Sequence, residues 1–255
     1  MLRRIAVVGE DQSLYETIKA AAVGKDVEVL HVKPRGNMPC GATAIVAAGG
    51  DGKRVLKAAL ALARGQEESL ELLAEAIDCR EAFRPGNSLR VRDHATRFAK
   101  ALGLTPADQC VLERAALVRD IGKLRVPNEI LLKDGLLTYE EWQTLQTHTA
   151  LGAQIIQETE ILRGTADCVH WHHECYDGTG YPDGLEGEKI PFLARAMRIL
   201  DVYCAMTSAR HYREGASTHE EAIEHLRSES GGHFDPALVN VFIKATVGRA
   251  EESTA

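Results

Sequence analysis

The feature that most constrains this fold is a series of segments with helical periodicity that runs from residue 67 almost to the end of the chain. In these segments apolar residues recur every three or four positions, which is typical of amphipathic helices. This part of the chain is therefore predicted to be all-α. The predicted helices are 68–82, 88–102, 106–121, 138–158, 161–173, 191–208, 217–228 and 236–247.

Local signals mark where several of these helices begin and where the series is interrupted. The stretch "YDGTGYPDGLEGEKIP" is too polar and too rich in glycine for a helix, so a loop is predicted there. Helix starts are indicated by capping residues: Thr105 before Pro106, Thr138 three residues before Glu141, and Ser217 three residues before Glu220.

The first 65 residues have a different pattern. Apolar runs at 5–8, 27–32 and 42–48 favour strands, and Leu14, Ile18 and Ala21 have helical spacing between the first two runs. This β-α-β pattern predicts a small α/β module over residues 1–65, followed by a helical domain over residues 66–255. The expected fold class of the whole chain is α+β.

Composition argues against several classes of protein. No apolar run approaches the roughly 20 residues that cross a bilayer, and no secretory signal is readable. The 6 cysteines form no CxxC pair, which predicts reduced thiols and a cytoplasmic protein. The net charge of -7 argues against a nucleic-acid duplex as partner and favours a small phosphorylated molecule.

Metal-binding residue types recur within the apolar helical pattern. Burying such a residue costs free energy unless it is paired or bound to a metal. A single histidine is more often a satisfied or exposed residue, but the joint occurrence favours a site of imidazole and carboxylate donors, which suit iron, manganese or zinc. The residues concerned are Asp120, His148, His172, His173 and Asp201.

Three stretches resemble one bacterial family in the order and spacing of their motifs. They are "RDIGKLRVPNEILLKDGLLTYEEWQTLQTHTALGAQII", "HHECYDGTGYPDGLEGEKIPFLARAMRILDVYCAMTSARHYR" and "GGHFDPALV". They look like an HD-GYP domain, a module associated with the hydrolysis of cyclic di-GMP, and the similarity runs from about residue 70 to residue 247. The resemblance implies a divalent metal, iron or manganese, and cyclic di-GMP or a related nucleotide as ligand.

The resemblance also divides the metal centre into a complete site and an incomplete one. The incomplete site would use Asp120, Asp201 and two nitrogen ligands, but Asn87 and Arg119 stand at the nitrogen positions. A third metal, found in some members, would need a glutamate where this chain has Phe83. The complete site is matched by Asp120, His148, His172 and His173.

Arg119 cannot act as a metal ligand, because its guanidinium stays protonated and has no lone pair to donate. It is expected to occupy the vacated site, neutralise Asp120 and Asp201, and offer donors to a phosphate. At most one metal and little turnover are therefore expected. His94 lies two helical turns after Asn87, about 10 Å along the helix, too far to replace the lost ligand, and is expected at the surface.

Most positions that hold the substrate in the family are retained. Asp120 and Lys123 would be the catalytic residues, and Lys123 would contact phosphate. Departures occur at His211 and Cys204, where the family has proline and aspartate. The remaining substrate-binding positions implied by the resemblance are Gly180, Tyr181, Pro182, Arg210 and Arg213; solvated charge is the alternative reading of the two arginines.

The N-terminal module is similar to a response-regulator receiver. Glu10 and Asp11 follow its first strand, as the magnesium-binding acidic pair of that family does. The third strand does not end in a phosphorylatable aspartate, since Asp51 comes late and in a turn. A truncated receiver that serves docking or dimerisation is expected.

Two functions remain open. The first is a regulator with impaired or lost phosphodiesterase activity that binds a nucleotide and signals through protein contacts of its helical domain, a homodimer included. Asn87 and Arg119 favour it. The second is an active phosphodiesterase with a single metal, which the complete metal site and Lys123 favour.

Overall fold

The computed structural model describes residues 3–8, 16, 19–20, 27–32, 42–46, 52–80, 86–208 and 217–247. Side chains are described for residues 16, 19, 20, 65–80, 86–208 and 217–246. The chain divides into a unit over residues 1–71 and a unit over residues 72–255. The division falls within helix α2, Gly52–Arg80, which also contains the boundary predicted at residue 65.

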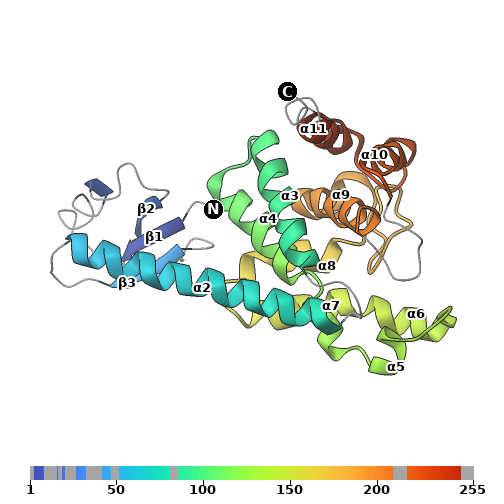
Figure 1. Ribbon diagram of the computed structural model, residues 1–255, viewed down its shortest axis with the longest axis horizontal. Helices are drawn as coiled ribbons and strands as arrows, with labels where there is room; N and C mark the ends of the chain where they lie inside the picture. The colour runs from blue at the N-terminus through green and yellow to red at the C-terminus, as the bar shows by residue number, and fades with distance from the viewer. Residues whose placement is uncertain are drawn as a thin grey trace. The chain divides into compact units, whose positions relative to one another are not determined.

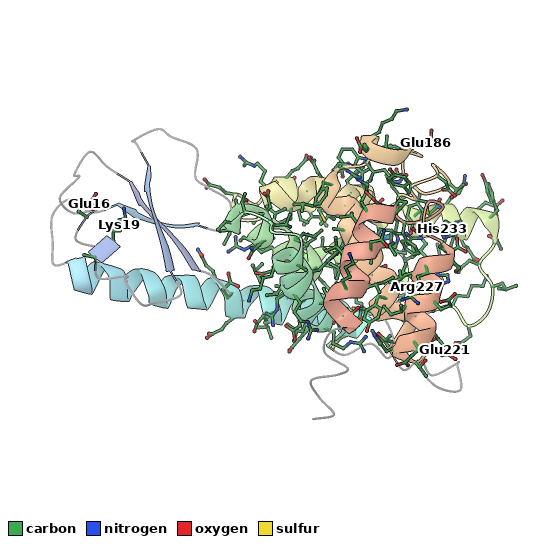
Figure 2. The ribbon with its side chains drawn as sticks, turned by 90° about the horizontal axis from the view of Figure 1, so that it is seen from above. Glu16, Lys19, Glu186, Glu221, Arg227 and His233 are labelled. Carbon is green, nitrogen blue, oxygen red and sulfur yellow. The ribbon has the colours of Figure 1, made fainter. Side chains whose placement is uncertain are left out.

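The N-terminal unit contains a small parallel sheet. Strands β1 (Arg3–Val8), β2 (Val27–Val32) and β3 (Ala42–Val46) are arranged in the order β2-β1-β3. Ile5 pairs with Val29 on one side and with Thr43 on the other. Glu16 and Lys19 are labelled in Figure 2 in the segment between β1 and β2. Most of the connecting segments lie outside the described residues, so the α/β module stays a prediction.

The C-terminal unit is helical, and its described residues contain no extended strand (Figure 1). Helix α3 packs against α4, α9 and α11, and α7 packs against α8. Its elements are α3 (Asn87–Ala101), α4 (Pro106–Val118), η1 (Ile121–Arg125), α5 (Asn128–Leu131), α6 (Tyr139–Gln146), α7 (His148–Gln157), η2 (Arg163–Thr165), α8 (Ala166–Trp171), η3 (Gly187–Lys189), α9 (Phe192–Met206), α10 (His219–Ser228) and α11 (Pro236–Val247).

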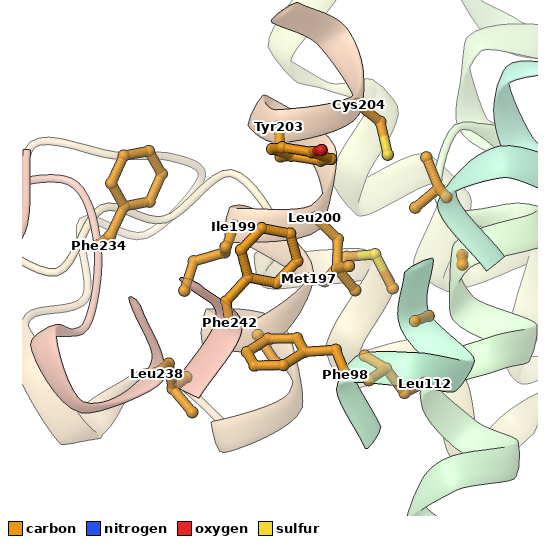
Figure 3. Packing of buried hydrophobic residues seen from close by; sticks show 14 of the residues in the cluster. Phe98, Leu112, Met197, Ile199, Leu200, Tyr203, Cys204, Phe234, Leu238 and Phe242 are labelled. Carbon is orange, nitrogen blue, oxygen red and sulfur yellow. The ribbon is translucent and has the colours of Figure 1, made fainter. Parts of the chain in front are cut away.

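One apolar core holds α3, α4, α9 and α11 together (Figure 3). Phe98 and Phe242 meet edge to face with their ring centroids 5.1 Å apart. Leu112, Met197 and Leu200 are fully buried around them. Burying each such side chain contributes about 1.5–3 kcal/mol to folding, so this core fixes the helices that carry the candidate site.

The helix starts follow the predicted capping chemistry with one correction. The hydroxyls of Thr105 and Thr138 accept hydrogen bonds from backbone N–H groups three residues later, as predicted. The predicted cap of α10, Ser217, is one residue too early. Thr218 is the actual cap, and its partner in the capping box is Glu221.

The helix predicted over 138–158 is divided in two. Three consecutive side chains donate to carbonyls in the last turn of α6: Thr147 to Thr144 at 2.6 Å, His148 to Leu145 at 2.7 Å and Thr149 to Gln146 at 3.1 Å. Such side-chain bonds compete with helix continuation. The break places His148 at the start of α7.

Among the described residues, no helix combines the length and the apolar character needed to cross a bilayer.

Candidate metal centre

Four of the predicted ligands come together from separate elements. Asp120 follows α4, His148 begins α7, and His172 and His173 follow α8. One ligand atom from each residue can be chosen so that all four atoms lie within 4.8 Å of one another. The structure therefore gathers the whole set that the sequence analysis assigned to the complete site.

Two glycines let the backbone segments of this cluster approach closely. A Cβ atom on Gly122 would lie 1.8 Å from the carbonyl oxygen of His148 and 2.6 Å from the backbone nitrogen of Gly152. No other residue type fits there without displacing α7 from η1. This approach brings Asp120 Oδ1 to 3.8 Å from His148 Nε2.

The imidazole of His172 is held in the tautomer whose Nε2 can donate a lone pair to a metal. Its Nδ1 lies 2.7 Å from the carbonyl oxygen of Val169, which fixes the proton on Nδ1. Its Nε2 is buried and has no hydrogen-bond partner among the described residues. Burial lowers the pKa of His172 to about 4, and burial also lowers the pKa of His173. Neutral imidazoles beside a carboxylate fit a divalent metal.

Arg119 lies between the carboxylates of Asp120 and Asp201. The residue is fully buried. Its Nε donates to Asp201 Oδ1 at 2.8 Å, and its Nη2 is 3.1 Å from Asp120 Oδ2. Burial alone would lower the pKa of Arg119, but Asp120 and Asp201 outweigh it and raise the pKa, so the guanidinium stays charged.

Lys123 adds a second cation at Asp120. Its Nζ lies 2.8 Å from Asp120 Oδ1. Burial would raise the pKa of Asp120, but Lys123 and Arg119 outweigh it and hold the pKa well below its ordinary range. The carboxylate of Asp120 is therefore ionised and already bound by two fixed cations.

Asn87 lies at the start of α3 beside this network. Its side chain is buried, and its Oδ1 has no hydrogen-bond partner within the described part of the chain. The neighbouring Ser88 Oγ is 3.4 Å from Arg119 Nη1. An amide oxygen is a weaker metal donor than an imidazole nitrogen.

Two residues at the centre were missed by the sequence analysis. Asp78 of α2 is buried and accepts hydrogen bonds from the backbone nitrogen and Oγ of Ser88, at 2.8 and 2.6 Å. Arg198 Nη1 lies 3.4 Å from His173 Nδ1. Two features of the sequence could have indicated these residues. Asp78 is an aspartate on an apolar helical face, and Arg198 lies one helical turn before Asp201.

The loop that contains Gly180, Tyr181 and Pro182, here called the Gly-Tyr-Pro loop, covers one side of the candidate ligand cluster. Tyr181 stacks on His173 with ring centroids 4.8 Å apart. A Cβ on Gly180 would lie 2.2 Å from the backbone nitrogen of Cys175, so this position requires glycine. The buried carboxylate of Glu174 accepts hydrogen bonds from the backbone of three loop residues, Asp183, Gly184 and Leu185.

Several predicted positions lie outside the described residues. They are Glu10, Asp11, Asp51, Phe83, Arg210, His211 and Arg213. Cys204 is described and buried, and burial raises the pKa of its thiol to about 11.

His94 was expected at the surface, and the structure places it in a half-buried position. Its ring lies 5.0 Å from that of Tyr203, and it lines a cavity of about 370 Å³ with Phe98, His219 and Phe242. The physical reason is that α11 packs against α3 and that His219 of α10 lines the same cavity, which the periodicity of α3 alone does not show.

Comparisons with known proteins show the family of this chain. Residues 71–238 match the model of a family described as "HD domain". This chain belongs to the HD domain family. Its relatives include the "Cyclic di-GMP phosphodiesterase response regulator RpfG" of Xanthomonas campestris, 36% identical over 188 residues, which are 73% of this chain and 49% of that protein. Together with the motifs, these relatives identify it as an HD-GYP member.

Two further similarities extend this result. "Cyclic di-GMP phosphodiesterase PA4108" of Pseudomonas aeruginosa is 44% identical over 155 residues, covering 59% of this chain and 37% of that protein. A crystal structure of a cyclic GMP-AMP phosphodiesterase from V. cholerae has a TM-score of 0.55 at 21% identity, covering 69% of this chain and 47% of the other, and shows the shared fold. The chain spans less than half the length of these relatives.

Proposed function

We propose that this HD-GYP protein is a cytoplasmic signalling regulator that binds cyclic di-GMP or a related cyclic nucleotide and has impaired or lost phosphodiesterase activity. The observation that carries the proposal is the buried guanidinium of Arg119 between Asp120 and Asp201. Those carboxylates would serve the incomplete metal site, and here a fixed cation holds both. Together with Lys123, Arg119 balances the charge of the two carboxylates without a metal, and a guanidinium generates no hydroxide.

The remaining site would hold one divalent metal at most, iron or manganese. Asp120, His148, His172 and His173 would be its ligands, and the buried Nε2 of His172 supports this fit. When bound, such a metal lowers the pKa of a water ligand and polarises a phosphoryl oxygen. Arg119 and Lys123 repel any cation next to Asp120, which weakens metal binding.

The chain's own polar groups suit binding of a phosphodiester. Arg119 and Lys123 supply positive charge, and the loop with Gly180, Tyr181 and Pro182 would border the ligand. The similarity to proteins named cyclic di-GMP phosphodiesterases supports a cyclic dinucleotide as the ligand class. Arg210 and Arg213 are proposed as further phosphate contacts from the family resemblance alone.

Residues 1–65 are proposed to form a truncated receiver-like module, followed by the HD-GYP domain over residues 66–255. Docking to a protein partner, or to a second copy of the chain, is the role proposed for the module.

The alternative is an active phosphodiesterase with one metal. The complete set of four donors and the retained Lys123 favour it. In that case the guanidinium of Arg119 would replace the positive charge of the second metal ion and would stabilise the negative charge of the transition state.

Metal content and turnover separate the two functions. Protein purified with ferrous and manganous ions preserved is expected to contain at most one ion per chain by mass spectrometry of the metals. Two tightly held ions would contradict the assignment. Efficient metal-dependent hydrolysis of cyclic di-GMP rejects the regulator and supports the alternative. Hydrolysis at or only slightly above the level of a metal-free control supports the regulator.

Restoring the missing nitrogen ligands is the most informative variant. Asn87→His with Arg119→His is expected to bind a second ion and to gain hydrolysis of cyclic di-GMP, because only those ligands are missing. The matched control, Asn87→His with Arg125→His, changes an exposed arginine of η1 and should gain neither.

A further inference from the structure

A line of aromatic rings leads from the histidine cluster to the surface. His173 stacks on Tyr181 with an interplanar angle of 24°. Tyr181 meets Trp142 edge to face, with 6.2 Å between ring centroids. Trp142 is 45% exposed. The line therefore ends in an accessible indole ring beside the candidate metal centre.

The fold fixes the backbone that carries this ring. Trp142 is the fourth residue of α6, and its backbone N–H donates to the carbonyl of Thr138 at 2.9 Å. The capping box between Thr138 and Glu141 closes the start of the helix. Glu141 also binds Lys133 Nζ at 2.6 Å, which ties the segment before α6 to its first turn.

We propose that the exposed face of Trp142 stacks on one nucleobase of a cyclic dinucleotide whose phosphate lies at the histidine cluster. The inference rests on the proposed function and adds a base subsite to the same site. One ribose separates a base from its phosphate, so a phosphate held at the cluster leaves its base near the rim formed by Tyr181 and Trp142. An aromatic ring stacks on any base, because every base has a π face.

Other exposed apolar residues lie in the same region. Leu132, Leu136 and Tyr139 are 47%, 94% and 71% exposed, and a protein partner would use such a surface as a whole. Trp142 differs because its ring contacts the loop residue Tyr181, which stacks on a candidate ligand of the metal. This continuity with the cluster favours a nucleotide base as the occupant of this ring.

Intrinsic fluorescence and calorimetry test the base subsite on the full chain with Mn²⁺ present. Trp142 and Trp171 are the 2 tryptophans, so the Trp171→Phe variant leaves Trp142 as the sole reporter. Cyclic di-GMP is expected to quench its fluorescence. In the otherwise unchanged chain, Trp142→Ala is expected to raise the Kd for cyclic di-GMP about 10-fold or more, and Trp142→Phe should recover most of the affinity.

Tyr139→Ala is the matched control, because it removes an exposed ring from the same helix and should leave the Kd unchanged. An equal Kd for the parent chain and Trp142→Ala overturns the base subsite alone. An equal loss in Tyr139→Ala also overturns it, since the loss would then belong to the surface of α6 as a whole. No binding of cyclic di-GMP by the parent chain refutes the proposed function, and the base subsite with it.

Discussion

Gly122 is the residue on which the approach of Asp120 to His148 depends. A methyl group at this position would meet the carbonyl oxygen of His148 at 1.8 Å, so Gly122→Ala must push α7 away from η1. We expect a loss of about 1–3 kcal/mol in the free energy of unfolding and weaker Mn²⁺ binding. Chemical denaturation and calorimetric titration with Mn²⁺ measure the two effects.

Gly65→Ala is the matched control for this change. Gly65 lies within α2, and a Cβ there would meet nothing within 4 Å. Alanine at an open helical position is expected to stabilise by up to about 1 kcal/mol and to leave Mn²⁺ binding unchanged. If Gly122→Ala behaves like Gly65→Ala, the close approach does not position the site.

The chemical role of a residue could be predicted from the sequence more readily than its contacts. Arg119 could be identified as a departure from the motif, because its chemistry follows from its side chain. The hydrogen bonds from Ser88 to Asp78 could not, because they depend on how α2 packs beside α3. Arg198 was missed for the same reason, since its partner His173 lies on another element.

The Gly-Tyr-Pro loop depends on one buried carboxylate. Glu174→Gln keeps the shape of the side chain but removes the charge and one acceptor oxygen shared by the backbone N–H groups of Asp183, Gly184 and Leu185. A hydrogen bond to a buried charged group contributes about 1.5–3 kcal/mol, so we expect a loss of about 2 kcal/mol in the free energy of unfolding. Faster proteolysis within residues 183–189 should accompany it.

Glu188→Gln is the corresponding control, because Glu188 belongs to the short helix η3 of the same loop and is exposed. It should change neither stability nor proteolysis. Equal behaviour of the two variants would show that the buried carboxylate does not hold the loop.

The start of a helix was predictable where apolar periodicity and capping agreed, as for α4. The division between α6 and α7 was not, because it arises from side chains that compete with the backbone for the same carbonyls. Periodicity continues across this break, so only the hydrogen bonds show it.

On the scale of the molecule, the site is assembled by the helical core. The candidate ligands are spread between residues 120 and 201, and they converge because α4, α7, α8 and α9 pack together. The stability of the helical unit and the integrity of the site are therefore coupled, and conditions that weaken the core should also weaken binding at the site.

His94 makes that stability depend on pH. Burial first, and then the charges of Arg97, Arg90 and His219, lower its pKa to about 4, while Asp93 opposes them. In the unfolded chain its pKa returns to about 6.5. Between these values the unfolded chain binds a proton at this position that the folded chain does not. The neutral His94 therefore costs the fold no stability above about pH 6.5. As the pH falls from 6.5 towards 4, protonation of the unfolded chain lowers the free energy of unfolding.

Comparison with His94→Gln isolates this effect from the other titrating groups. Urea unfolding of both proteins at pH 7.5 and 4.5 should show the parent chain losing about 1–2 kcal/mol more than the variant, with solvent screening of a partly exposed ring allowed for. Parallel pH profiles for the parent chain and His94→Gln would show that the burial of this ring does not keep the imidazole neutral.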